Sequence, residues 1–459
     1  MPGATLRRLC THVAAVLLLA SLEALAQVPA QEAAKLGGPE LTPLGAERAG
    51  NASGSIPPWT GGIQEWPDGY EPGDHHPDPF AEDAVQFSIS AANLAEHADR
   101  LSEGQKALLE AYPDTWRMPV YPTRRSASYP ERVYAAVQEN ARAAELRTEG
   151  KGGVVLSNVS SPFPLPRSGV EVVWNHNLRF RGVRVQRSNG YAPVTRSGDY
   201  RVVLQEQDFA FPYAAPPDSA FRTKRPNLLL AVKTRTIQPV LLGGNGVLLL
   251  EPIDQTKDPR KSWSYLRDLR RVVRNPTLRY YYPAPASEGL RTFDDSELFN
   301  GPPDRFEWRL LGKRELYIPY NAYRLHSNEL GPGEILQRRH IDPELARYEL
   351  HRVWVVEGTL KPGRNHIYSR RVFYVDEDSW QIAVADTWDL KGRLWRVNEA
   401  HAINYYEVPL VWTTLEVYHD LRERRYLAVG LDNDRNMYRF SEGGDPREFS
   451  PNALLYYIR

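Results

Sequence analysis

The stretch KSWSYLRDLRRVVRNP, residues 261–276, fits two structures, and the choice between them decides the fold class. Its apolar residues recur at helical spacing between basic ones, as in an amphipathic helix that binds a membrane or a nucleic acid. The same letters also fit one strand over 262–266, a turn at 267–268 and a second strand over 269–274. Four arginines give the stretch its basic character: Arg267, Arg270, Arg271 and Arg274.

The sequence on either side favours the two strands. After Gly182 apolar and polar residues alternate with a period of two, and turn signals such as GGNG at 243–246 and KPG at 361–363 separate the segments. Basic and acidic side chains both number 57, which gives no reason to expect a nucleic acid or an anionic membrane as partner. We therefore predict a large antiparallel sheet of consecutive strands joined by short turns.

The two-strand interpretation carries two expectations for the opening stretch. Trp263 and Tyr265 lie two residues apart, so they share one face of the sheet. The arginines lie at the rim or across from neighbouring strands, beside the acidic Asp294, Asp295 and Glu297.

Residues 1–26 have the pattern of a cleavable signal peptide. Arg7 and Arg8 precede a short apolar run, and the small residues at 24–26 fit a cleavage site; a general export signal is favoured over a twin-arginine one. The run is shorter than the roughly 20 residues of a membrane-spanning helix. The chain has one cysteine, Cys10, which precedes that run and does not fit a lipid-bearing position. We expect a periplasmic protein without a lipid anchor and without disulfides.

Three further segments follow the signal. Residues 27–92 are rich in Gly and Pro but carry aromatic residues, which predicts an extended arm lying on the rest of the protein. Residues 93–182 are expected to be helical, with a capping box from Ser102 to Gln105 and a helix start at Pro130. Residues 183–459 form the sheet, in one compact unit with 93–182.

The sequence lacks several common catalytic motifs. The chain lacks G-x-S-x-G, a P-loop and H-E-x-x-H, so we expect no catalytic residues, no cofactor and no enzyme. The loop DHHPD at 74–78 is either a surface loop, which we favour, or a zinc or nickel site. Carboxylates at 294–295 and 376–378 are either ordinary turn residues or an acid–base pair, and the latter leaves an envelope hydrolase as a third functional reading.

Two groups of residues are candidates for contact with a partner. Arg124 and Arg125 precede the second expected helix and either meet a phosphate or, as we favour, form salt bridges. Trp59 and Trp66 stand in the Pro/Gly-rich arm. Arginines interleaved with aromatic residues, as in YSRRVFY at 368–374, are better explained by contacts across strands than by nucleic acid binding.

Four long stretches resemble a bacterial family filed as domain of unknown function 1329. They are LTPLGAERAGNASGSIPPWTGG (41–62), LSEGQKALLEAYPDTWRMPVYPTRRSASYPERVY (101–134), PFPLPRSGVEVVWNHNLRFRG (162–182) and RRVFYVDEDSWQIAVADTWDLKGRLWRV (370–397). That family is grouped with carriers similar to the periplasmic LolA and LolB shuttles. WSYL, RRVVR and then TFDDSELF resemble the tryptophan strand, the basic strand and the acidic loop of that superfamily.

The resemblance implies a fold and a function. The fold is α+β and mainly antiparallel β, a large curved half-barrel wrapped over helices that plug its concave side, with a hydrophobic cavity between them. The function is a periplasmic carrier of a lipid or other hydrophobic molecule, associated with outer-membrane barrels and resistance-nodulation-division-type permeases. The alternative is a periplasmic adaptor that links such a permease to a barrel and carries nothing. The candidate residues for the cavity wall are Trp263, Tyr265, Phe306, Trp308, Tyr317, Trp354, Phe373, Tyr374 and Trp388.

Overall fold

A computed structural model describes residues 28–148, 153–155, 157–276 and 279–458. The predicted signal peptide therefore lies outside the described residues. Within the described ranges, no helix has both the length and the apolar character to cross a membrane.

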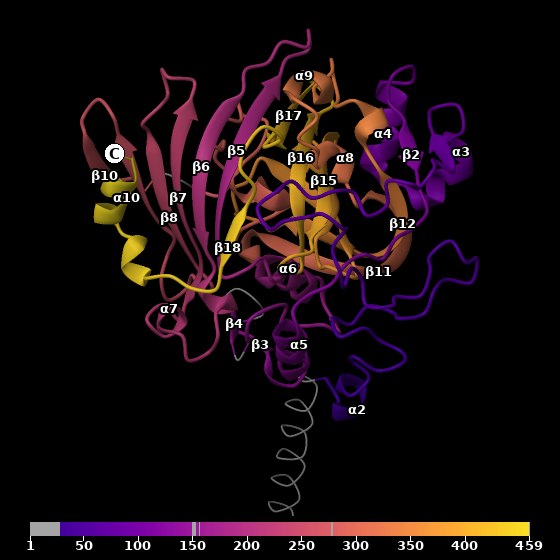
Figure 1. The fold of residues 1–459 in the computed structure, drawn as a ribbon, viewed down its shortest axis with the longest axis horizontal. Helices are drawn as coiled ribbons and strands as arrows, with labels where there is room; N and C mark the ends of the chain where they lie inside the picture. Colours follow the sequence, from indigo (N-terminus) through magenta and orange to yellow (C-terminus); the bar gives the residue numbers. More distant parts are fainter. Residues whose placement is uncertain (1–27, 149–152, 156, 277–278, 459) are drawn as a thin grey trace, which may run out of the picture.

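One large sheet dominates the protein (Figure 1). Sixteen strands belong to it, and a separate two-stranded sheet is formed by β3 (Glu145–Leu146) and β4 (Val154–Val155). The strands of the large sheet are β1 (Phe87–Ile89), β2 (Met118–Val120), β5 (Arg184–Val194), β6 (Val203–Ala210), β7 (Leu228–Gln238), β8 (Gly246–Pro252), β9 (Lys261–Leu266), β10 (Arg271–Arg274), β11 (Phe306–Pro319), β12 (Tyr348–Leu360), β13 (Tyr368–Asp376), β14 (Ile382–Asp389), β15 (Leu394–Tyr405), β16 (Leu410–Asp420), β17 (Arg425–Gly430) and β18 (Arg439–Ser441).

The sheet consists of two meanders joined side by side. Strands β5 to β10 pair in chain order, and so do β11 to β17, each strand antiparallel to the next. The two meanders meet where β17 pairs with β5, from Tyr426 opposite Val194 to Gly430 opposite Gly190. Because β10 and β11 lie far apart in this order, residues 275–305 must return across the sheet. The expected α+β class, with an unclosed curved antiparallel sheet, is confirmed.

The opening stretch forms two strands, as the flanking sequence predicts. β9 and β10 pair antiparallel, from Leu266 opposite Arg271 to Trp263 opposite Arg274, and a tight turn joins them. The expected acidic neighbours are wrong, however. The arginines of this hairpin are exposed, and the Arg267 guanidinium donates to backbone carbonyls of the β7–β8 turn.

Register assigns the side chains of β5 to β9 to two faces, which we call the inner and the outer face. Residues directly opposite each other on paired strands share a face. Arg187, Gln207, Thr234 and Val247 are such neighbours on the inner face. The corresponding row on the outer face is Asp208, Lys233, Leu248 and Trp263.

Each face is covered by different elements. On the inner face, α6 (Gly169–Leu178) packs on β11 and β12, and the 3-10 segment η3 (Phe293–Leu298) packs on β14 to β16. On the outer face, α4 (Glu103–Ala111) packs on β14 and β15, and α10 (Pro451–Ile458) packs on β7 to β10. Among the described helices, α6 covers the inner face as expected, and the returning segment covers another part of that face.

The remaining short elements connect these layers. The expected capping box is present at the start of α4, and the helix after Pro130 begins at Glu131. The other helical elements are α2 (Ala30–Ala33), α3 (Leu94–His97), η1 (Ala98–Arg100), α5 (Glu131–Ala143), η2 (Pro212–Ala214), α7 (Ala220–Thr223), η4 (Pro303–Arg305), α8 (Tyr323–His326), α9 (Pro332–Ile335), η5 (Pro343–Leu345) and η6 (Pro446–Glu448).

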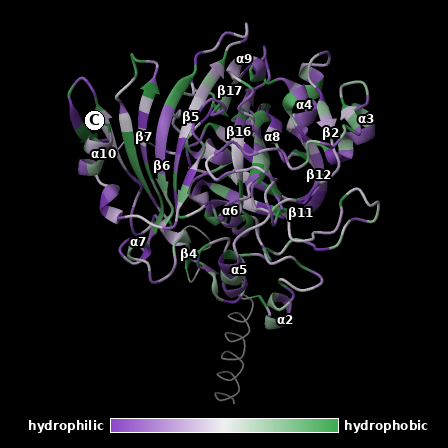
Figure 2. Ribbon diagram, in the orientation of Figure 1, coloured by the Kyte–Doolittle hydropathy of each residue, from purple (hydrophilic) through white to green (hydrophobic). Residues whose placement is uncertain are grey.

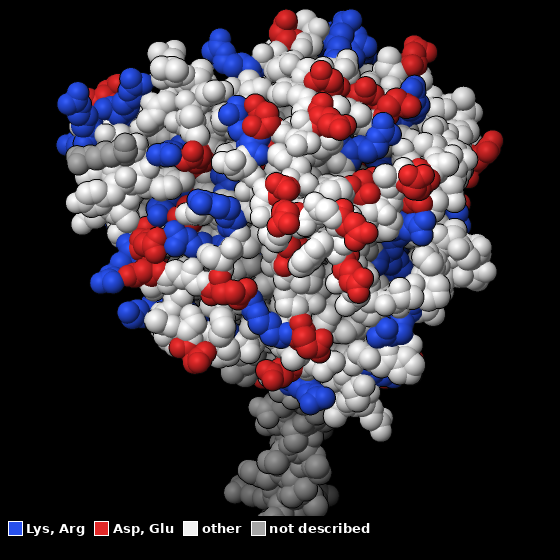
Figure 3. Space-filling view, viewed as in Figure 1, with Lys and Arg blue, Asp and Glu red and all other residues white. Residues whose placement is uncertain are grey.

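Hydropathy and charge vary along the sheet in an informative way. Figure 2 shows that β6 is hydrophilic over its middle, where the sequence reads Gln205-Glu206-Gln207-Asp208. Gln205 and Gln207 lie on the covered inner face, where such residues are uncommon, and mark a polar zone there, while Glu206 and Asp208 lie on the outer face. On the outside, Figure 3 shows basic and acidic side chains interspersed, with basic ones gathered over the β9–β10 hairpin.

Candidate functional site

A cavity lies between the inner face of β5 to β8 and the returning segment. Its volume is about 140 Å³, on the scale of the protein cavities that hold a benzene-sized molecule. The lining residues come from six strands, from the β8–β9 connection and from the segment 284–300: Arg187, Asn189, Tyr191, Gln205, Gln207, Phe209, Leu230, Val232, Thr234, Val247, Leu249, Arg260, Ala284, Pro285, Arg291, Phe293, Ser296, Glu297, Asn300, Glu416 and Val429.

One row of the cavity floor is apolar. Phe209, Val232 and Leu249 are successive cross-strand neighbours on β6, β7 and β8, and each is at least nine-tenths buried. Leu230 lies two residues before Val232 and extends this surface along β7. A continuous apolar row of this kind favours the burial of a hydrocarbon, at about 25 cal/mol per Å² removed from water.

The next row of the floor is polar and tightly hydrogen-bonded. Arg187 Nε donates to Gln207 Oε1 at 2.9 Å, and Gln207 Nε2 donates to the Tyr191 hydroxyl at 2.8 Å. Arg187 Nη1 donates to the Tyr438 hydroxyl at 3.2 Å. The floor of the cavity is thus amphipathic, with hydrocarbon at one end and hydrogen-bonding groups at the other.

The roof is fastened to the inner face by a buried ion-pair network. Arg371, which is fully buried on β13, donates to Asp294 Oδ2 and Asp295 Oδ1, both at 3.0 Å. The Tyr418 hydroxyl on β16 donates to the Asp295 carbonyl at 2.7 Å, and Arg396 Nη2 on β15 donates to the Gly289 carbonyl at 2.6 Å. These contacts hold the acidic loop around Asp294 and Asp295. From the sequence, arginines of the β9–β10 hairpin are expected beside this loop, but the arginines that hold it lie on β13 and β15.

Glu297 closes the end of the roof next to α6. Its carboxylate accepts hydrogen bonds from Arg179 and Arg181, which follow the end of α6. Burial opposes ionisation, but the guanidinium groups of Arg181 and Arg179 hold the pKa of Glu297 at about 2. His176, on the last turn of α6, also contacts the Glu297 carbonyl at 3.1 Å. The roof is therefore held by ion pairs over residues 294–297.

The nine aromatic residues predicted for the cavity wall do not line this cavity. Trp263 and Tyr265 share a face as expected, but it is the outer face, where α10 packs. The other seven residues lie on β11 to β14, in the second half of the sheet: Phe306, Trp308, Tyr317, Trp354, Phe373, Tyr374 and Trp388. Six of them belong to hydrophobic clusters there or pack against them, and Phe306 is buried against Trp308 and His366. A role for the nine aromatic residues in ligand binding stays a prediction.

The four residues predicted to contact a partner divide into two buried and two exposed ones. Trp59 is 9% exposed, and its Nε1 donates to the Ala127 carbonyl. Arg125 donates to both carboxylate oxygens of Asp378, at 2.6 and 2.8 Å, so the favoured salt bridge is confirmed. Trp66 is 48% exposed, and Arg124 forms an exposed pair with Asp83. Partner contact through Trp66 and Arg124 stays a prediction.

The loop at 74–78 is partly internal. His76 is 3% exposed; its Nε2 contacts Glu407 Oε2 at 2.7 Å and its Nδ1 contacts His326 Nε2 at 3.1 Å. Asp78 instead accepts from the Phe80 backbone N–H, so its carboxylate caps a turn. The loop therefore serves to attach the arm to α8 and to the β15–β16 turn.

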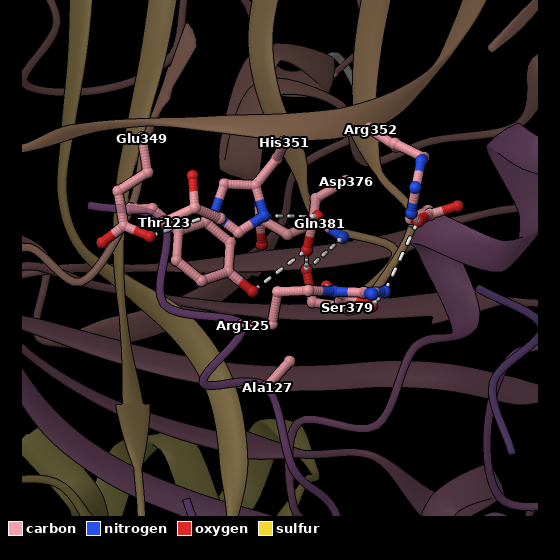
Figure 4. A network of polar contacts seen from close by, with 12 residues as sticks. Thr123, Arg125, Ala127, Glu349, His351, Arg352, Asp376, Ser379 and Gln381 are labelled. Carbon is pink, nitrogen blue, oxygen red and sulfur yellow. Dashed lines mark hydrogen bonds and ion pairs between the residues drawn. The ribbon is translucent and has the colours of Figure 1, made fainter. Parts of the chain in front are cut away.

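A second polar network lies where the segment after β2 crosses β12 and β13 (Figure 4). Among the described residues, His351, Asp376 and Asp378 bring three ligand-type atoms within 4.8 Å of one another. Burial and the charge of Asp378 raise the pKa of Asp376 to about 6, while His351 Nε2 contacts Glu349 Oε2 at 3.1 Å. Since Arg125 donates to both oxygens of Asp378, this network joins chain segments by ion pairs.

The residues at the polar end of the cavity are absent from the sequence-based candidates. Arg187, Asn189 and Tyr191 belong to β5, whose sequence RVQRSNGYAPV contains Asn-Gly and Pro and resembles a turn. The signal that could have found them is the alternation of Arg187, Asn189 and Tyr191 at a spacing of two, matched by Gln205 and Gln207 in the next strand.

Comparison with known sequences gives one family and a full-length relative. The sequence model described as Protein of unknown function (DUF1329) matches residues 88–455. Uncharacterized protein PA3922 of Pseudomonas aeruginosa is 43% identical over 445 residues, covering 97% of this chain and 97% of that protein.

Comparison with solved structures gives more distant similarities. A domain described as an outer membrane lipoprotein-sorting protein domain, from Vibrio parahaemolyticus, is 14% identical with a TM-score of 0.43, covering 62% of this chain and 98% of that one. A DUF1329 family protein from Desulfovibrio piger is 15% identical with a TM-score of 0.40, covering 60% and 92%. A LolA superfamily protein from Nitrosomonas europaea is 9% identical with a TM-score of 0.38, covering 63% and 100%.

Proposed function

We propose that this chain, which belongs to the DUF1329 family, is a periplasmic carrier of a lipid or other hydrophobic molecule, part of which lies in the cavity on the inner face of its sheet while a longer chain displaces the covering segment. The single observation that carries the proposal is the amphipathic cavity between β5 to β8 and the segment 284–300. A carrier needs such a water-excluding space and needs no reacting groups.

The construction of the roof supports this proposal. The segment that covers the cavity is almost devoid of regular structure, and it is attached to the inner face through side chains at defined points such as Asp294, Asp295 and Glu297. A covering of this kind can be displaced locally without unpairing a strand, because its contacts are side-chain ion pairs. Hydrophobic cargo would enter by such a displacement at a membrane or at a partner protein.

The names of the similar proteins support a carrier over an enzyme. None of the proteins reported above is named for an enzymatic activity, and one solved relative is described as a lipoprotein-sorting domain. The carboxylates Asp294 and Asp295, which the sequence offers as an acid–base pair, are both held by Arg371. This engagement favours a structural role for them.

A blocked cavity tests the proposal. Val247 lies on the inner face of β8 and lines the cavity, so Val247→Trp places an indole in the space that cargo would occupy. Val240, in the turn between β7 and β8, is 79% exposed, so Val240→Trp is the matched control. We expect a fluorescent fatty probe to bind the wild-type protein and Val240→Trp equally, and to bind Val247→Trp at least about tenfold more weakly.

Two results would count against the carrier. If the wild-type protein takes up no hydrophobic probe, there is no cargo to carry. If Val247→Trp keeps the wild-type fold by circular dichroism and binds the probe with unchanged affinity, the cargo lies somewhere other than this cavity.

A further inference from the structure

Arg187 is a cation at the cavity without a carboxylate partner. Its guanidinium lies 4.8 to 5.2 Å from the ring centres of Phe209, Trp412 and Tyr438, and its two hydrogen bonds go to neutral groups on Gln207 and Tyr438. No described carboxylate lies within salt-bridge distance of it. Aromatic rings position a guanidinium but do not neutralise it, so its charge remains available to the cavity.

Two further arginines at the cavity have unused donors. Arg291 is 8% exposed, and its Nε is buried without a hydrogen-bond partner in the described part of the chain. Arg260 pairs with Glu251 through Nε, but its Nη1 is likewise buried and unpartnered. A buried donor without an acceptor costs about 1–3 kcal/mol, so both groups gain from an acceptor that a ligand brings.

The charges that line the cavity are out of balance. Arg187, Arg260 and Arg291 line it, against the carboxylates of Glu297 and Glu416, and Arg260 is already neutralised by Glu251 outside the cavity. Glu297 is already neutralised by two arginines outside the cavity, Arg179 and Arg181. Glu416 accepts from the Thr413 hydroxyl, and its nearest approach to Arg291 is 3.9 Å. The polar end of the cavity is therefore positive.

From these observations we infer that the cavity receives a hydrophobic molecule with an anionic head, a carboxylate or a phosphate, and that Arg187 with Arg291 binds that head. The inference rests on the carrier function proposed above and specifies the class of cargo. The apolar row of Phe209, Val232 and Leu249 lies one residue pair away from the row of Arg187 and Gln207. The tail of a single-chain amphiphile can therefore contact the apolar row while its head contacts the hydrogen-bond donors of the neighbouring row.

The choice of an anion over a neutral head follows from hydrogen-bond chemistry. Guanidinium groups only donate, and a planar fork of N–H groups matches the two oxygens of a carboxylate or a phosphate. An alcohol head satisfies one donor and neutralises no charge. A hydrogen bond to a charged acceptor is worth more than one to a neutral acceptor, which predicts a clear preference between heads on identical tails.

Three ligands with the same sixteen-carbon tail test this on the wild-type protein at pH 7.5: palmitate, hexadecyl phosphate and hexadecan-1-ol. We expect one or both anions to bind at least about tenfold more tightly than the alcohol, and this preference to shrink in high salt. Whichever anion binds more tightly identifies the head group as carboxylate or phosphate. For palmitate labelled with ¹³C at its carboxyl carbon, we expect NMR to show a pKa below that of the free acid when bound.

The variant Arg187→Met tests the named residue. We expect it to weaken binding of the preferred anion by about tenfold or more and to leave binding of hexadecan-1-ol unchanged. Arg271→Met, on the exposed strand β10, is the matched control and should change neither. Arg187→Lys keeps a charge without the planar fork, and its affinity for the preferred anion should lie between those of the wild-type protein and Arg187→Met.

The outcomes separate this inference from the carrier function. If anions and alcohol bind with equal affinity, the anionic head is refuted while the carrier stands. If none of the three ligands binds, the carrier function itself fails. Should Arg187→Met misfold, the wild-type preference between heads and the ¹³C titration decide the matter, and a bound carboxyl with an unshifted or raised pKa refutes the inference.

Discussion

Glu399 shows how a single buried residue makes this protein sensitive to pH. It is fully buried on β15, where it accepts hydrogen bonds from Gln105 Nε2 at 3.2 Å and from the Tyr348 hydroxyl at 2.9 Å. Both donors are neutral, so burial raises the pKa of Glu399 to about 7. Asp386, one strand away, is raised to about 7 by the same cause.

The direction of the pH effect follows from the raised pKa. Between the ordinary glutamate pKa and pH 7 the folded chain keeps this proton while the unfolded chain has lost it. The free energy of unfolding therefore falls as the pH rises through this range, because the unfolded state binds fewer protons. The contribution is fully present below about pH 4 and is lost above about pH 7.

Glu399→Gln removes this titration while keeping the shape and one accepting oxygen. We expect the difference in the free energy of unfolding between pH 5 and pH 8 to become smaller than in the wild-type protein by about 2–3 kcal/mol. Urea unfolding at the two pH values measures it, with Glu307→Gln, exposed on β11, as the control. An unchanged pH dependence in Glu399→Gln would show that this carboxyl titrates normally in the folded protein.

Among the elements, α6 depends on its first turn. Ser168 and Glu171 form a capping box, in which the Ser168 hydroxyl accepts from the Glu171 N–H and the Glu171 carboxylate accepts from the Ser168 N–H. The helix ends just before Arg179 and Arg181, which hold the roof through Glu297. The cap therefore stabilises the element that positions one end of the cavity roof.

Ser168→Ala should lower the free energy of unfolding by about 1 kcal/mol, which is the usual cost of losing an N-cap side chain. Ser168→Thr retains the hydroxyl and should cost less. Thermal or urea unfolding of the two variants compares them directly, and equal stability of the alanine and threonine variants would exclude the cap as the source of the effect.

Elements with a clear period could be predicted from the sequence, and elements whose letters conflict with their structure could not. The β9–β10 hairpin was assigned from the alternation around it, although Leu266, Leu269 and Val273 fit a helix locally. β5 contains Asn189-Gly190 and Pro193, which are typical of turns, yet pairing with β6 and β17 keeps it extended. Its cavity residues could not be named from the sequence, because letters of this kind do not say which side chains of a strand share a face.

The sequence also does not predict which face of each strand lies on the inside of the sheet. The spacing of Trp263 and Tyr265 predicts that they share a face, but it does not predict which element packs on that face. In the structure this element is α10, near the end of the chain. The buried ion pairs of Arg371 with Asp294 and Asp295 likewise depend on the return of one segment across the sheet, which is a property of strand order. The order of strands in a sheet is not encoded in the local sequence pattern of the residues that it brings together.

At the scale of the whole molecule, the N-terminal arm is built into the folded unit. Ile63 and Tyr70 belong to the main hydrophobic cluster, and Arg125 Nη2 donates to the Glu47 carbonyl. Trp59 lies against Arg48 and is almost fully buried, while Trp66 is 48% exposed. The arm therefore contributes to stability, and one of its two tryptophans remains on the surface for any partner.

The two arm tryptophans form a matched pair for testing this. Trp59→Ala should lower the free energy of unfolding by about 3 kcal/mol, because a large buried side chain and a hydrogen bond are lost, whereas Trp66→Ala should change it by less than about 0.5 kcal/mol. Urea unfolding measures both. Equal effects of the two variants would show that the arm does not pack on the sheet as the structure places it.

The most direct test of the central claim is native mass spectrometry of the protein purified without detergent from bacteria, before and after incubation with palmitate and hexadecyl phosphate. The carrier account predicts one bound hydrophobic molecule per chain, either retained from the cell or taken up on incubation, and its absence from Val247→Trp. A wild-type chain that is recorded bare in every condition, or a Val247→Trp chain that is loaded as fully as the wild type, would contradict the account.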